Sequence, residues 1–191
     1  MRRLRGTAAA APLLALAACA SPATGPAPQA VDVSPAAQAV AVAQPQDDAN
    51  SCTSPAGYRV GFPTDWSTNE AGVLPTCSWF GPGEVVVPAA SDVRTAPVAL
   101  QVVDAPLAEV AVPVPDEVAR TQLQVGGRPA VRTEQVTTRG LYPEGTRITT
   151  WALDLGGRTL LADAVEVPGG DHERAVAVLD DMVEGLETTA R

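Results

Sequence analysis

Residues 20–50 are rich in proline and small residues, and this stretch confines the folded part of the chain to the residues after it. It contains five prolines and no aromatic residue. Such a segment buries too little apolar surface to offset the conformational entropy that is lost on ordering. We therefore expect a disordered tether at 19–50 and a single globular domain at 51–191, since these 141 residues are enough for one hydrophobic core.

The first 18 residues have the pattern of a secretory signal peptide. A basic start at 1–5 precedes an apolar run at 8–18, which is too short to cross a bilayer. The run ends in Leu16-Ala17-Ala18-Cys19, which resembles the lipobox of bacterial lipoproteins. In that family the cysteine receives a diacylglyceryl group and the signal peptide is cut just before it. The resemblance implies a signal peptide at 1–18 and a lipidated Cys19; the alternative is an ordinary signal peptide in which Cys19 is incidental.

The charge of the chain favours an anchor made of lipid. The formal charge is −9, and loss of the three arginines of the signal peptide leaves 10 basic against 22 acidic residues, or about −12. Such a domain is repelled by an anionic membrane surface and by nucleic acid. Two or three acyl chains anchor a protein stably where one does not. We therefore expect a cell-membrane lipoprotein that is held on the extracytoplasmic face through Cys19 and binds no nucleic acid.

Two cysteines remain in the domain, Cys52 and Cys77. Because an exported compartment is oxidising, their even number favours a disulfide, which would contribute about 3–4 kcal/mol. The alternatives are two buried thiols or a metal pair. His172 is the single histidine, and one histidine with two cysteines falls short of the four ligands of a structural zinc site.

The domain carries mainly strand signals. Residues 57–63 alternate, with Tyr58, Val60 and Phe62 on one face, and 97–103 form an apolar run typical of a central strand. Residues 64–70 read as a polar turn in which Trp66 is the only large apolar side chain. Residues 116–122 are ambiguous, and their composition allows a short helix.

The last third of the chain predicts a hairpin followed by a helix. Gly156-Gly157 suits a two-residue hairpin turn, and Asp171 occupies the position of an N-cap. From 172 to 186 the apolar period becomes 3.6 residues. These patterns predict an α+β fold with a mainly antiparallel sheet and a C-terminal amphipathic helix.

Three segments resemble PsbP-like domains. The first is 57–66, which fits Tyr-x-Val-x-aromatic-Pro-x-x-Trp; the second is 127–132, which fits Gly-x-Pro-Ala-x-Arg; the third is the closing helix at 178–186. Lipid-anchored members include the LpqN-like lipoproteins. The resemblance implies an α/β/α sandwich, in which helices flank a mainly antiparallel central sheet. It also implies a binding or assembly role without a catalytic residue set.

No catalytic, cofactor-binding or metal-binding motif stands out. His172 begins the final helix and is expected to be exposed to solvent, and Asp180 and Asp181 are expected on a solvated helix face. With only seven aromatic residues, we expect the tryptophans to fill the core. Trp66 is the exception, because its polar surroundings make it a candidate ligand contact.

The expected function is therefore non-catalytic binding, of either an envelope protein or a small amphiphilic ligand. The alternative is an envelope hydrolase that uses carboxylates in a cleft. A deep pocket with two converging carboxylates would favour the enzyme, whereas an apolar groove would favour the binding protein.

Overall fold

The structure is a computed structural model that describes residues 49–88 and 94–189. They belong to one compact unit that spans Gln44–Arg191. The predicted signal peptide, Cys19 and nearly all of the predicted tether lie outside the described residues. The first strand begins at Ala49, two residues before the predicted start of the domain. No helix within the described ranges is long and apolar enough to span a membrane.

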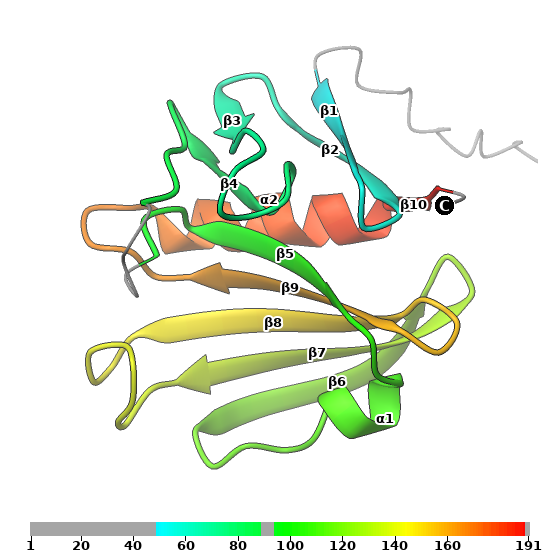
Figure 1. The fold of residues 1–191 in the computed structure, drawn as a ribbon. Helices are drawn as coiled ribbons and strands as arrows, with labels where there is room; N and C mark the ends of the chain where they lie inside the picture. The colour runs from blue at the N-terminus through cyan, green and yellow to red at the C-terminus, as the bar shows by residue number, and fades with distance from the viewer. Residues whose placement is uncertain (1–48, 89–93, 190–191) are drawn as a thin grey trace, which may run out of the picture. The chain divides into compact units, whose positions relative to one another are not determined.

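A seven-stranded antiparallel sheet forms the body of the domain (Figure 1). In the order in which they lie side by side, its strands are β3 (Trp66–Thr68), β4 (Trp79–Pro82), β5 (Val98–Val103), β9 (Thr159–Val165), β8 (Arg147–Asp154), β7 (Arg128–Val136) and β6 (Glu117–Val125). The predicted central strand at 97–103 is confirmed as β5. The hairpin between β8 and β9 turns at Gly156 and Gly157, which both have positive φ, as the sequence predicts.

A second, three-stranded sheet contains β1 (Ala49–Ser54), β2 (Tyr58–Pro63) and β10 (Glu187–Thr188). The disulfide between Cys52 and Cys77 is confirmed, with Cα atoms 5.9 Å apart. It joins β1 to the segment that leads into β4. The Tyr58 hydroxyl donates a 2.6 Å hydrogen bond to the Cys77 carbonyl, so the small sheet is fixed to the large one at a second point.

The C-terminal amphipathic helix is confirmed as α2 (His172–Glu184). The Asp171 side chain accepts a 3.0 Å hydrogen bond from the amide of Arg174, as expected for an N-cap. The helix packs on β9, β8 and β2, behind β4 and β5 in the view of Figure 1. Its buried residues are His172, Ala175, Val178, Leu179, Met182 and Val183.

The prediction of a short helix at 116–122 is wrong, because residues 117–122 form the first part of β6. Gly126 and Gly127, at φ 56° and 77°, turn the chain so that β6 pairs with β7, and this pairing outweighs local helix propensity. A single-turn helix, α1 (Leu107–Val110), precedes it. Within the described ranges α2 is therefore the one long helix. The fold is dominated by antiparallel sheet and is more β than the expected sandwich flanked by helices.

The predicted polar turn at 64–70 is confirmed only at 64–65, because β3 occupies residues 66–68. Pairing of β3 with β4 turns Trp66 into the core, where 4% of its surface is exposed. Trp66 is thus a buried residue rather than a side chain exposed on a loop. Trp151 is buried as predicted and Trp79 is half-buried.

Candidate binding groove

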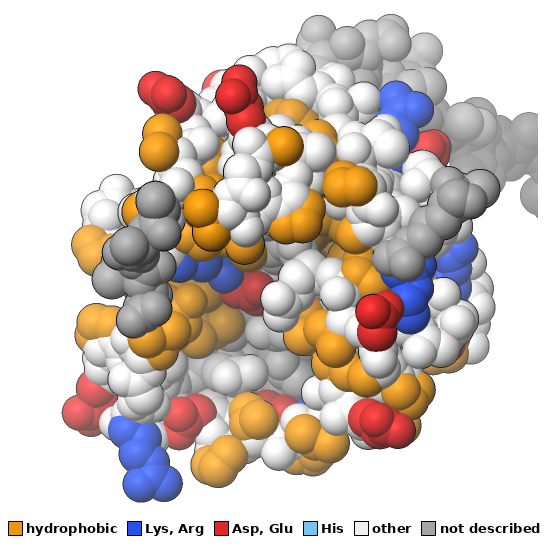
Figure 2. Space-filling model, viewed as in Figure 1, with side chains coloured by type: hydrophobic (Ala, Val, Ile, Leu, Met, Phe, Trp, Pro, Cys, Tyr) orange, Lys and Arg blue, Asp and Glu red, His pale blue; other side chains and the backbone are white. Residues whose placement is uncertain are grey.

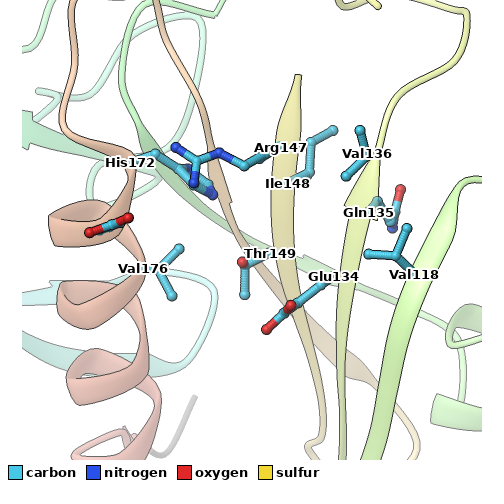
Figure 3. A pocket seen from close by; sticks show the side chains of 10 residues that line it. Val118, Glu134, Gln135, Val136, Arg147, Ile148, Thr149, His172 and Val176 are labelled. Atoms are coloured by element: carbon cyan, nitrogen blue, oxygen red, sulfur yellow. The ribbon is translucent and has the colours of Figure 1, made fainter. Parts of the chain in front are cut away.

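A groove opens on the helix-bearing face of the sheet, where α2 stops short of β7 and β6. It has a cavity volume of about 280 Å³ (Figure 3). We call it the α2 groove, and its lining residues are Val118, Glu134, Gln135, Val136, Arg147, Ile148, Thr149, His172, Glu173 and Val176. The groove therefore combines aliphatic side chains with polar groups of both signs.

The helical and strand periods explain why these residues meet. His172, Val176 and Asp180 are four residues apart, so they lie on one flank of α2. Across the groove, Glu134 of β7 and Thr149 of β8 are register partners and share a face of the sheet. Figure 3 shows Val176 opposite Thr149 and Glu134, with His172 and Arg147 together at one end of the groove.

A β-bulge brings Val118 to the rim of the groove. The register of β6 with β7 shifts between Glu117 and Ala119, which leaves Val118 as the extra residue. Its side chain is 65% exposed and lines the groove beside Val136. Local sequence carries no signal for this placement, because a bulge depends on the pairing of two strands.

The prediction that His172 is exposed is wrong. Only 8% of its surface is exposed, and its Nδ1 has no hydrogen-bond partner among the described residues. Burial lowers the pKa of His172 below its ordinary value of 6.5, and the nearby positive charge of Arg147 lowers this pKa further. Three acidic neighbours, Glu166, Glu173 and Asp171, oppose the shift without reversing it. The imidazole is therefore neutral at neutral pH.

Arg147 and Glu166 form an ion pair at the same end of the groove. The Nε and Nη2 atoms of Arg147 donate to the two carboxylate oxygens of Glu166 over 3.2 and 3.3 Å. These hydrogen bonds, with one from the Arg147 amide, lower the pKa of Glu166. The remaining nitrogen, Nη1, has no acceptor within the part of the chain that the structure describes.

Asp180 is a structural residue and does not belong to a solvated face as predicted. It accepts a 2.6 Å hydrogen bond from Nε1 of Trp151 and a 3.2 Å bond from Nε of Arg132. Arg132 also donates to Glu134 over 2.6 Å and lies 6.0 Å from the ring centre of Trp151. This cluster joins α2 to β7 and β8 beyond the groove. Asp181 is exposed, as predicted.

The opposite face of the sheet is hollowed, and hydrophobic side chains gather around the hollow (Figure 2). A cavity of about 540 Å³ lies between α1 and the β6–β7 hairpin, lined by Leu107, Ala111 and Val131 among others. A third cavity, of about 290 Å³, includes Trp66, whose Nε1 is buried without a partner among the described residues. In residues 49–88 and 94–189 no three His, Cys, Asp or Glu side chains are placed to hold a metal ion.

No protein-family model matches the sequence, and no curated protein sequence matches it either. A solved structure from Bacteroides thetaiotaomicron VPI-5482 is similar over 75% of this chain and 50% of its own, with a TM-score of 0.48 and 13% sequence identity. The chain thus spans about half the length of that protein.

The buried imidazole predicts a specific pH dependence of stability. Because the folded pKa of His172 is lowered, the unfolded chain binds a proton at about pH 6.5 while the folded chain stays neutral. The free energy of unfolding should therefore fall as the pH drops through 6.5 toward the folded pKa. Urea unfolding at several pH values should show this, and His172→Gln should remove it. His172 is the only histidine, so an equal fall in the variant would contradict the prediction.

Proposed function

We infer that the chain is a lipid-anchored lipoprotein of the cell envelope, with a domain of the PsbP-like (LpqN-like) kind that binds a small amphiphilic ligand without catalysis. Cys19 carries the lipid, and the tether at 19–50 holds the domain on the extracytoplasmic side of the membrane. The ligand occupies the α2 groove. The observation that carries the binding role is the composition of this groove, in which three valines face polar groups that are held by the sheet and the helix.

The groove suits an amphiphile because both aliphatic and polar side chains line it. Val118, Val136 and Val176 provide aliphatic walls, and burial of an alkyl chain contributes about 0.8 kcal/mol per methylene. Arg147 and His172 lie together at one end, where a polar head group finds hydrogen-bonding partners (Figure 3). Binding pockets commonly combine an apolar lining with a few fixed polar groups.

The alternative, an envelope hydrolase that uses carboxylates of a cleft, has less support. Glu134 is bound by Arg132, and Glu166 is bound by Arg147. The hydrogen bonds from Arg147 lower the pKa of Glu166, which makes that carboxylate a poor general acid. The groove therefore fits the binding role better.

The binding role is tested by titration calorimetry with three hexyl amphiphiles, one each with a neutral, an anionic and a cationic head group. At least one should bind residues 20–191 at a single site. Val176→Trp should abolish this binding because it fills the groove. Ala177→Trp is the matched control, since Ala177 is an exposed neighbour on the same helix. Failure of all three amphiphiles, or equal binding by both variants, would refute the proposal.

The anchor is tested by Cys19→Ala. In cells that are fed a fatty-acid analogue, the natural chain should be labelled and should sediment with membranes. The variant should lose all of the label because it lacks the acceptor thiol. Cys52→Ala is the control and should keep the label. Label that persists in the Cys19 variant would show that the chain is acylated at another residue.

A further inference from the structure

Two uncharged polar side chains form the floor of the α2 groove. The surface of Thr149 is 4% exposed and that of His172 is 8% exposed. Nδ1 of His172 is buried without a hydrogen-bond partner among the described residues. The Thr149 hydroxyl, which is not itself fully buried, makes no hydrogen bond within residues 49–88 and 94–189. A buried polar group without a partner is costly, and in native structures most such groups are satisfied by protein, water or ligand. The Thr149 hydroxyl and the His172 imidazole are therefore available for hydrogen bonds with a bound molecule.

The charges around this floor already balance one another. Arg147 pairs with Glu166 at 3.2 Å, and Arg132 pairs with Glu134 at 2.6 Å. Among the lining residues with an ionised side chain, Glu173 alone makes no ion pair within the described residues. An anionic head group would have to lose its water without gaining a free cation, and a cationic head group would find only the solvent-exposed carboxylate of Glu173. Either head group would also meet a like charge from one member of each pair.

We propose that the α2 groove selects an uncharged, hydroxyl-rich head group that carries a short aliphatic chain, as in an alkyl glycoside. The proposal rests on the proposed function and specifies its ligand class. Each hydroxyl of such a head group donates and accepts one hydrogen bond, which matches Thr149, His172 and the unpaired Nη1 of Arg147. The aliphatic chain lies against Val118, Val136 and Val176.

The head-group preference is measured with residues 20–191, which contain the whole compact unit. The probes are hexyl glucoside, hexyl sulfate and hexyltrimethylammonium, which share one aliphatic chain. Hexyl glucoside should bind at least about tenfold more tightly than either charged probe, a difference of about 1.4 kcal/mol. Tighter binding of a charged probe would overturn this inference and leave the proposed function standing. Failure of all three probes would overturn the proposed function as well.

A second measurement tests the role of the groove floor. Thr149→Val keeps the shape of the side chain and removes its hydroxyl, so the affinity for hexyl glucoside should fall by about five- to tenfold. Thr150→Val is the matched control, because Thr150 is the next residue of β8 and faces the other side of the sheet. The control should bind hexyl glucoside as the unaltered chain does. Equal affinities of the two variants for hexyl glucoside would refute the assignment.

Discussion

Reduction of the Cys52–Cys77 disulfide should lower the free energy of unfolding of the domain by about 3–4 kcal/mol. The bond closes a segment of 25 residues and joins β1 to the chain just before β4. Reduction raises the conformational entropy of the unfolded chain and leaves that of the folded chain nearly unchanged, so the unfolded state becomes more favourable. The carbonyl of Cys77 also accepts the hydrogen bond of Tyr58, so loss of the cross-link weakens the fixation of the small sheet. Urea unfolding with and without reductant measures the effect.

The control for this experiment is the double variant Cys52→Ala, Cys77→Ala. It should unfold at a lower urea concentration than the oxidised protein, and reductant should not change its midpoint further. Cys77 is fully buried, so reduction should require transient opening of the β1 region and be slow in the folded state. An unchanged midpoint after complete reduction would show that the cross-link does not constrain the unfolded chain.

The parts of the fold that the sequence predicted correctly are those whose signals are local. The alternation of Tyr58, Val60 and Phe62 predicts β2, the glycine pair at 156–157 predicts a hairpin, and Asp171 marks the start of α2. Each of these features depends on neighbouring residues only. The disulfide was also predicted correctly, because the domain contains only two cysteines and they can pair only with each other.

The parts that the sequence did not predict depend on contacts between distant segments. Residues 66–68 are polar apart from Trp66, and they form β3 because β4 pairs with them. Residues 117–125 form β6 because the turn at Gly126 and Gly127 places them against β7. The same reason applies to the groove, since burial of His172 requires α2 to pack beside β8. A period of 3.6 residues predicts a helix but does not fix which sheet residues its flank will meet.

Asp180→Ala should destabilise the domain by about 2–3 kcal/mol, because it leaves the buried indole N–H of Trp151 and the guanidinium of Arg132 without their shared acceptor. The surface of Trp151 is only 3% exposed, so its indole N–H depends largely on Asp180 for a hydrogen-bond partner. Asp180→Asn keeps an acceptor for Trp151 and should cost less. Asp181→Ala is the matched control, since Asp181 is exposed on the same helix and should change the free energy of unfolding by less than about 0.5 kcal/mol. Urea unfolding that is followed by tryptophan fluorescence measures all three variants. Equal effects of Asp180→Ala and Asp181→Ala would mean that the cluster of Arg132, Trp151 and Asp180 does not hold α2 against β7 and β8.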